Sequence, residues 1–138
     1  MAEMTRDEIY AWLDHGPQWL RVATVGSDGY PHIVPLGYFR QGDDIVIHMR
    51  GQRRVNVRRN PSVCLLLDAG SARNDLKGVV IQGDATLVED PADLIELTRA
   101  GARARGVPED QLPTEARRGR VFARIRPVKF ASWDNSKP

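Results

Sequence analysis

The sequence predicts a mainly β fold: a closed or split six-stranded antiparallel barrel with Greek-key-like connections and flanking helices. Six segments rich in β-forming residues are separated by turn sequences such as Ser27-Asp28-Gly29. Strands do not alternate with long helices, and no Gly-x-Gly-x-x-Gly or P-loop sequence is present, which argues against a doubly wound α/β fold. The chain of 138 residues is expected to form a single domain over residues 1–138.

The first half of the chain is predicted to hold two helices and three strands. Thr5 and Glu8 form a capping-box pattern that begins an amphipathic helix, which ends at Gly16-Pro17. Pro35 lies inside a strand and marks an edge, a bulge or a point where the strand opens, because proline has no N–H to donate to a ladder. Strands are expected over 19–25, 32–39 and 45–49, and a short helix over 52–59.

The second half is predicted to hold three strands and a longer helix. Asp90 and Pro91 have the residue types of a helix N-cap and first turn, so a helix is expected to begin there. Gly83 and Pro127 are expected to bend their strands. The strands are predicted over 62–68, 79–88 and 120–132, with loops over 69–75 and 106–114.

Composition limits the classes of function. No apolar run is long enough to span a bilayer, and the first residues do not resemble a signal peptide, so a cytoplasmic protein that does not bind membranes is expected. Cys64 is the only cysteine and lies in an apolar run, which predicts a buried core thiol. The three histidines and this cysteine have no metal-ligand spacing, so no metal site is predicted.

Arginines are concentrated in two regions, although the net charge is only +2. Such clustering favours an anionic partner, with a solvated basic surface as the alternative. Nucleic acid is a poor candidate, because no aromatic residues are interleaved with the arginines to stack on bases. The first region contains Arg50, Arg53, Arg54, Arg58 and Arg59, and the second runs over 99–126.

The first arginine region coincides with the start of the predicted short helix. A helix N-terminus has free N–H groups and partial positive charge, so Arg50, Arg53 and Arg54 crowd like charges there. An anion would relieve that crowding, and Gly51 lets a ligand approach the backbone closely. The residues therefore indicate a phosphate site.

Three motifs carry a family resemblance. They are Pro31-His32-x-x-Pro35, Arg53-x-x-Asn56-Val57 and the Arg-Arg-Asn-Pro sequence over 58–61. In this order and spacing, the chain resembles the pyridoxamine 5′-phosphate oxidase-like FMN-binding split-barrel superfamily. Its small size and the ending over 132–137 look like the actinobacterial F-420-dependent oxidoreductases of the split-barrel B group.

The resemblance implies a homodimer with cofactor sites at the subunit interface. The cofactor phosphate would be held by basic residues after the third strand, and the ring would lie against the second strand. Trp133 is expected either to dock on its own chain or to cross the interface and help form the substrate pocket. Tyr38 is also a candidate residue of the substrate pocket or the dimer interface. The implied cofactor-binding residues are Val34, Pro35, Arg50, Gly51, Arg53, Arg54, Asn56 and Lys77.

The resemblance also implies an activity. Reduced coenzyme F-420 would donate a hydride to an activated double bond of a conjugated or aromatic small molecule. The alternatives are an FMN-binding oxidase and a non-catalytic flavin- or deazaflavin-binding protein. No catalytic side chain is identified: Tyr38 and His48 are candidate proton donors, but core or interface roles are favoured. Arg58 and Arg59 are expected to contact a cofactor tail or only water.

Overall fold

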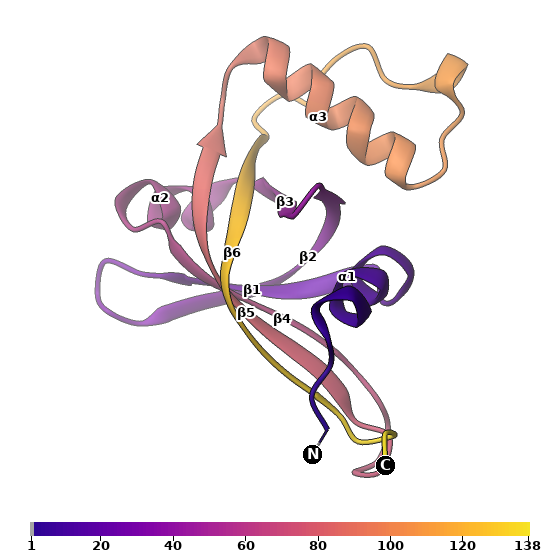
Figure 1. Cartoon of the computed structure of the whole chain (residues 1–138). Coiled ribbons are helices and arrows are strands. Elements are labelled where there is room, and N and C mark those ends of the chain that lie inside the picture. The colour runs from indigo at the N-terminus through magenta and orange to yellow at the C-terminus, as the bar shows by residue number, and fades with distance from the viewer. Residues whose placement is uncertain (1) are drawn as a thin grey trace.

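Six antiparallel strands close into a barrel in the order β1-β2-β3-β6-β5-β4 in this computed structural model, which describes residues 2–138 (Figure 1). The predicted six-stranded barrel is therefore confirmed. Helices α1, α2 and α3 flank it, and a short 3-10 turn precedes the last strand. The strands are β1 Trp19–Val25, β2 Pro31–Gln41, β3 Asp44–Met49, β4 Ser62–Ala69, β5 Lys77–Val88 and β6 Val121–Asp134; the helices are α1 Arg6–His15, α2 Gly51–Arg59, α3 Pro91–Ala104 and the 3-10 turn Glu109–Gln111.

Local sequence signals account for the helix ends. Thr5 and Glu8 form the predicted capping box, in which the Glu8 N–H donates to Thr5 Oγ1 at 3.1 Å and the Thr5 N–H donates to Glu8 Oε1 at 2.9 Å. Asp90 caps α3 by accepting from the Asp93 N–H at 3.3 Å. Most strand limits differ from the prediction by one or two residues; β5 begins at Lys77 and β6 continues to Asp134, and the polar loop contains the 3-10 turn.

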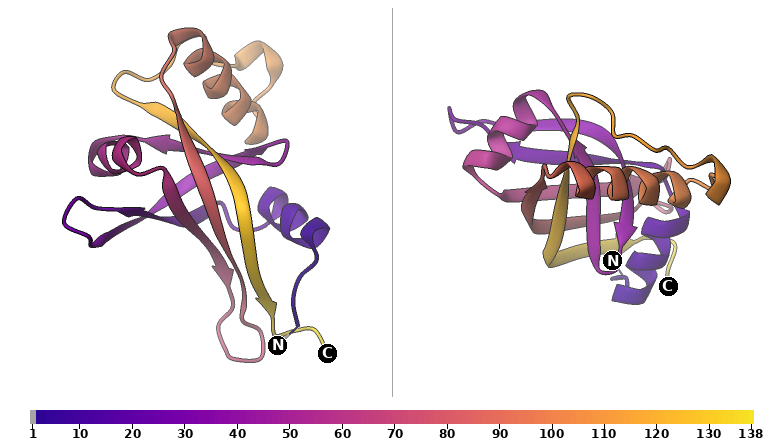
Figure 2. Two further views of the ribbon diagram at one scale, coloured as in Figure 1. Left: turned by 60° about the vertical axis from the view of Figure 1, so that its left-hand side comes forward. Right: turned by 90° about the horizontal axis from the view of Figure 1, so that it is seen from above.

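The barrel interior holds the main core, and a second core lies under α3. Strand β3 is apolar on both faces because Ile45 and Ile47 face the interior, whereas Val46 packs with Phe122 and Leu97 of α3. Helix α3 therefore covers one end of the barrel, away from both termini (Figures 1 and 2). Gly101 of α3 allows close packing, since a Cβ there would lie 3.0 Å from the Phe39 ring.

The predicted bends combine in one β-bulge between β5 and β6. Gln82 pairs with Lys129 and Gly83 pairs with Pro127, so Val128 is the extra residue. A Cβ on Gly83 would lie 2.6 Å from the side chain of Ile125, which explains the glycine. The bulge leaves the Val128 side chain exposed on the outer face of the sheet.

Strands β2 and β3 are paired over only part of their length. Their ladder begins at Gln41 and Asp44 and ends at Tyr38 and Ile47. Beyond this point β2 continues to Pro31 paired only with β1, and β3 continues to Met49 paired only with β6. The barrel is thus split along this line, and Pro35 lies on β2 where only β1 pairs with it, at an edge of the kind that was one of the three alternatives for this proline.

Asn56 fastens α2 to the barrel. Its side chain is fully buried, donates through Nδ2 to Thr24 Oγ1 at 3.1 Å, and accepts from Gln52 Nε2 at 2.8 Å. Val57 is also buried, whereas Val55 is exposed. Because α2 buries few apolar side chains, this polar link has a large share in fixing the helix on β1.

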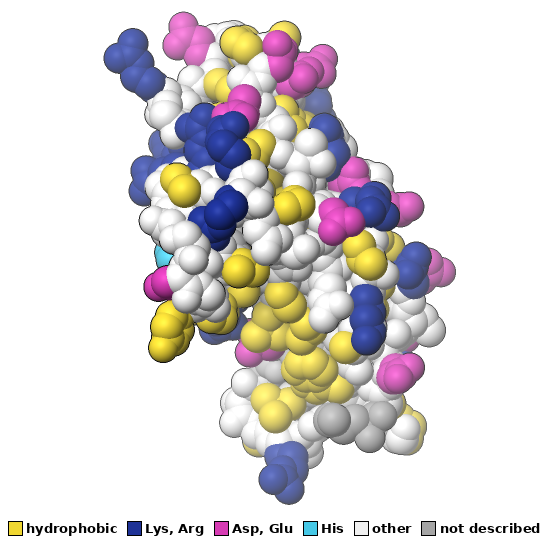
Figure 3. Space-filling view, turned by 90° about the vertical axis from the view of Figure 1, so that its left-hand side faces the viewer, with side chains coloured by type: hydrophobic (Ala, Val, Ile, Leu, Met, Phe, Trp, Pro, Cys, Tyr) yellow, Lys and Arg dark blue, Asp and Glu magenta, His cyan; other side chains and the backbone are white. Residues whose placement is uncertain are grey.

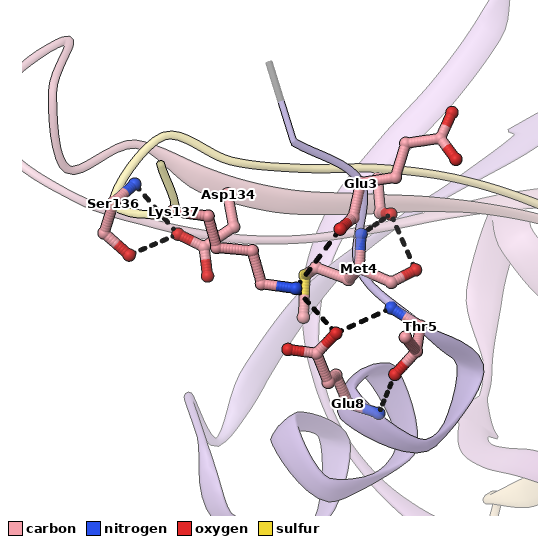
Figure 4. A network of polar contacts seen from close by, with 8 residues as sticks. Glu3, Met4, Thr5, Glu8, Asp134, Ser136 and Lys137 are labelled. Atoms are coloured by element: carbon pink, nitrogen blue, oxygen red, sulfur yellow. Dashed lines mark hydrogen bonds and ion pairs between the residues drawn. The ribbon is translucent and has the colours of Figure 1, made fainter.

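The two ends of the chain are joined (Figure 4). Lys137 Nζ contacts Glu8 Oε1 at 2.6 Å, and the Met4 N–H donates to Ser132 Oγ at 2.9 Å. The Lys137 ammonium and the Thr5 N–H together lower the pKa of Glu8 from its ordinary 4.5 to about 2. Helix α1 is therefore tied to the strand that ends the chain.

Replacing Asn56 with alanine is expected to lower the free energy of unfolding by about 1–3 kcal/mol, because the change leaves the Thr24 hydroxyl without this partner and removes one buried and one partly buried hydrogen bond. Urea unfolding measures the change. Val55→Ala on the same helix is the matched control and should change stability by no more than about 0.5 kcal/mol, since Val55 is exposed. Equal effects of the two substitutions would contradict the assigned role of Asn56.

Stability should depend on the charge of Glu8 at acid pH. Its folded pKa of about 2 is below the ordinary 4.5, so its contribution is complete above pH 4.5 and is lost as pH falls toward 2. Lys137→Met should therefore lower Tm at neutral pH and lose that effect at the acid end of this window. Thermal unfolding at low salt measures both profiles, and parallel profiles would show that the contact does not stabilise the fold.

Candidate functional site

The start of α2 has exposed, uncapped backbone donors. Arg50 is the N-cap residue and its backbone is extended, and within residues 2–138 no side chain caps this helix end. Gly51 follows with φ of +62°, a conformation that favours glycine. The first turn contains no acidic residue. The N–H groups and helix dipole are thus left to attract an anion.

Arginines from two distant segments meet at this helix start. Arg50 follows β3 directly and Arg120 precedes β6 directly, and the last pair of the β3–β6 ladder is Met49 with Val121. Arg53 lies one helical turn on, and its Nε donates to the His48 carbonyl at 3.2 Å. Burial, Arg50 and Arg120 all lower the pKa of Arg53. The sequence showed that 99–126 is basic, but the strand register is needed to place Arg120 here.

His48 lies among these arginines as a neutral imidazole. Its ring packs on Phe122 with centroids 4.5 Å apart. Burial, followed by Arg120, Arg105, Arg53 and Arg117, lowers its pKa to about 4. Its Nδ1 has no hydrogen-bond partner in the described part of the chain. At neutral pH, His48 is therefore not an imidazolium acid.

The other arginines of α2 are held by the protein itself. Arg54 and Arg58 both contact Glu89 Oε2 at 2.6 Å, and Arg59 donates to the Val25 carbonyl. Arg54 was expected beside Arg50 and Arg53 at a phosphate, but the structure places it with the Glu89 carboxylate. Arg50 and Arg53 remain as the predicted basic residues at the helix start.

The residues expected to contact a ring lie on β2 past the end of its ladder with β3. Val34 is half-buried and pairs with Val22, and Pro35 is exposed and pairs with Arg21. Ile33 is on the same face as Pro35 and is 61% exposed. This strand edge is apolar and accessible.

Three further predicted residues make contacts elsewhere. The Tyr38 hydroxyl lies 2.9 Å from the Leu13 carbonyl oxygen and 2.7 Å from that of Pro17, and burial raises its pKa to about 12. Lys77 Nζ lies 4.5 Å from the Trp12 ring centroid, at the opposite end of β5 from Glu89. Trp133 packs on the backbone of Gly78, where a Cβ would lie 2.2 Å from its ring. The structure thus favours docking of Trp133 on its own chain.

A groove of about 450 Å³ lies on the outer face of the sheet beside the β-bulge. It was not predicted, although Gly83 and Pro127 had marked the bend that forms it. Cys64 lines it and is half-buried, and burial raises the pKa of its thiol. The lining residues are Ala23, Thr24, Val25, Pro31, Ser62, Val63, Cys64, Gln82, Gly83, Asp84 and Val128.

Figure 3 shows a group of hydrophobic side chains with basic side chains, Lys or Arg, above it. Strand register defines the face: Ile33, Ala23 and Cys64 form one row, and Pro35, Arg21 and Leu66 form the next. Among residues 2–138, no three His, Cys, Asp or Glu side chains are grouped to hold a metal ion. In the same range, no helix has the length and apolar character needed to cross a membrane.

Known structures and families resemble this chain over most of its length. The family described as pyridoxamine 5′-phosphate oxidase matches residues 5–134. The conserved hypothetical protein Rv2991 from Mycobacterium tuberculosis has a TM-score of 0.82 at 27% identity, over 96% of this chain and 86% of that chain. No protein of curated function gives a match.

Two further solved structures share the fold at lower identity. An F-420 reductase has a TM-score of 0.66 at 22% identity, over 88% of this chain and 95% of that chain. A FAD-binding protein from Mesorhizobium loti has a TM-score of 0.71 at 21% identity, over 95% of each chain. Since the family match spans almost the whole sequence and the barrel agrees with it, this chain belongs to the pyridoxamine 5′-phosphate oxidase-like superfamily of split barrels.

Proposed function

We propose that this protein is an F-420-dependent reductase that transfers a hydride from the reduced deazaflavin to an activated double bond of a conjugated or aromatic small molecule. The observation that carries the proposal is the uncapped start of α2, where Arg50 and Arg53 converge with free backbone N–H groups. F-420 and FMN both present a phosphate joined to a planar tricyclic ring, which is the chemistry that this site and the apolar edge of β2 can accept.

The residues present fit a phosphate. Among residues 2–138, apart from its chain neighbours and the backbone of its own helix, no heavy atom lies within 4 Å of the place where a Gly51 Cβ would stand, so the backbone there is open to a ligand. Among residues 2–138, no Asp or Glu is ion-paired with Arg50 or Arg53. Guanidinium groups and N–H donors would hold the phosphate by charge-assisted hydrogen bonds.

The ring would lie against β2, where Val34 and Pro35 offer an apolar surface on a strand edge. When bound, reduced F-420 supplies the hydride, and the protein orients the two reactants and excludes water. Neither candidate proton donor is well suited to act as an acid at neutral pH, because the pKa of Tyr38 is about 12 and that of His48 is about 4. We propose that the proton comes from solvent.

The number of arginines favours F-420 over FMN. One phosphate needs two or three basic groups, but Arg105, Arg117 and Arg120 also lie near His48. F-420 carries carboxylates beyond its phosphate, which additional cations would balance. FMN remains the second candidate, as the cofactor of an oxidase or of a non-catalytic binding protein, because the family match is to pyridoxamine 5′-phosphate oxidase.

We also propose that the protein is a homodimer that uses the outer face of β2, β1 and β4. Trp19 and Ile33 there are 64% and 61% exposed, which is unusual for large apolar side chains on one sheet. A second copy is the favoured occupant, because the face has exposed apolar side chains and is continuous with the β2 edge that would hold the ring. Pairing two such faces would keep ring and substrate dry.

The cofactor can be tested by fluorescence titration of the purified protein with F-420 and with FMN. F-420 should bind, and Arg53→Ala should weaken binding by about 1.5–3 kcal/mol, because a charge-assisted hydrogen bond is lost. Arg73→Ala, an exposed arginine in the β4–β5 loop, is the control and should bind as the wild type does. If the protein binds FMN but not F-420, the cofactor choice is wrong.

Catalysis is tested by mixing the protein with reduced F-420 and a quinone and following oxidation of the cofactor. If the protein does not accelerate this oxidation, it is a non-catalytic binder.

The dimer can be tested with Ile33→Asp. A charge on the apolar face should convert a dimer into monomers, as measured by sedimentation velocity, whereas Val55→Asp on α2 should leave the dimer intact. Both side chains are exposed to a similar extent in the single chain, at 61% and 57%, so folding should survive in each and is checked by circular dichroism. A monomeric wild type, or a dimeric Ile33→Asp variant, would exclude this interface.

A further inference from the structure

Two arginines lie just beyond the end of the β3–β6 ladder. His48 pairs with Phe122 and Met49 pairs with Val121, so Arg50, directly after β3, and Arg120, directly before β6, are the next residues on either side. Like charges at opposed positions on neighbouring antiparallel strands destabilise the sheet. Arg120 is half-buried, which limits how far its charge can be solvated.

Arginines elsewhere on this sheet have acidic partners. Arg124 on β6 contacts Asp44 at 3.9 Å across the same β3–β6 ladder, and Arg126 contacts Asp84 at 2.7 Å across the β5–β6 ladder. Within residues 2–138, Arg120 makes no ion pair. Arg120 thus differs from the arginines within the strands, each of which has an acidic partner.

Two more arginines strengthen the local field. Arg53 reaches the same place from the first turn of α2, and Arg117 lies near Arg120 in the segment before β6. Burial, Arg117 and Arg50 lower the pKa of Arg120, so the charged form of this side chain is less favourable here than in water. The carboxylate partners seen along the rest of β6 are replaced here by further cations.

We propose that Arg50 and Arg120 form a clasp across the end of the β3–β6 ladder that closes on a multiply charged phosphate ligand, with Arg120 binding the anion from the strand opposite α2. This inference rests on the phosphate position of the proposed function and adds a binding residue to it. Arg120 makes the site favour ligands with several negative charges. A ligand with one negative charge neutralises only part of the positive charge of Arg50 and Arg120, whereas a ligand with several removes the repulsion between them.

The clasp makes two predictions of opposite sign for Arg120→Gln. Removing the charge relieves repulsion in the free protein and raises its stability, but it removes one ligand of the anion and weakens binding. An arginine with only a structural role would lose stability on substitution, and a solvated arginine would change neither quantity. Arg118→Gln is the matched control, since it removes the same charge from an exposed position in the same segment.

Thermal unfolding of the wild type and both variants, with and without millimolar tripolyphosphate, tests the clasp. Arg120→Gln should raise the Tm of the free protein by about 1–3 °C at low salt and at least halve the rise that tripolyphosphate causes. Arg118→Gln should match the wild type in the second measurement. A fall in the Tm of the free Arg120→Gln protein, or an undiminished response to tripolyphosphate, would refute the clasp.

A parallel titration with F-420 separates this inference from the proposed function. If both are correct, Arg120→Gln should weaken F-420 binding about tenfold or more. If the wild type responds to tripolyphosphate through Arg120 but does not bind F-420, the clasp stands and the proposed cofactor fails. If F-420 binding requires Arg53 and is unchanged in Arg120→Gln, the proposed function stands and the clasp fails.

Discussion

The pairing of β3 with β6 is the contact on which the rest of the molecule depends. It joins segments that are far apart in the chain and closes the barrel. The same ladder ends at Met49 and Val121, just before α2 begins. Its register therefore places Arg120, directly before β6, beside the start of α2. Non-local pairing of this kind is slow and entropically costly to form, so the apolar run over 45–47, buried on both faces, is what stabilises it.

The electrostatics of the chain follow two different rules. Several arginines elsewhere on the surface have acidic partners: Arg40 with Asp14, Arg103 with Glu109, and Arg54 with Glu89. Such exposed pairs add little stability individually, but they keep the local charge balanced. At the start of α2, Arg50, Arg53 and Arg120 have no acidic partner among the described residues, and the helix dipole adds to their positive charge. A local sacrifice of stability for binding is typical of functional sites.

Prediction from sequence succeeded where the signal is local. The capping box at Thr5, the N-cap at Asp90 and the bend at Gly83 depend on residues within a few positions of one another, and the structure confirms all three. The arginine-rich start of α2 was also found, because helix ends are encoded locally. These signals place the elements and indicate their type, but they do not pair the strands.

What was missed depends on pairing between distant segments. The sequence does not show that Glu89, directly after β5, lies beside α2, so it could not predict that Arg54 and Arg53 make different contacts. Nor could Arg120 be placed near Arg50 without the β3–β6 register. Trp133 was expected in a polar tail, but β6 continues through it because the backbone of Gly78 leaves room for the indole ring. Each case required the position of a partner many residues away.

The two parts of the proposed ligand, its ring and its phosphate, need opposite surroundings. A tricyclic ring is held best by a dry apolar surface, whereas a phosphate needs cations and N–H groups near water. This chain separates the two: the exposed apolar residues lie on the outer face of β1 and β2, and the arginines gather where β3 ends and α2 begins. The split between β2 and β3 lies between these surfaces. A ligand with a flat ring at one end and anionic groups at the other would span the split, so its length as well as its charge would decide what binds.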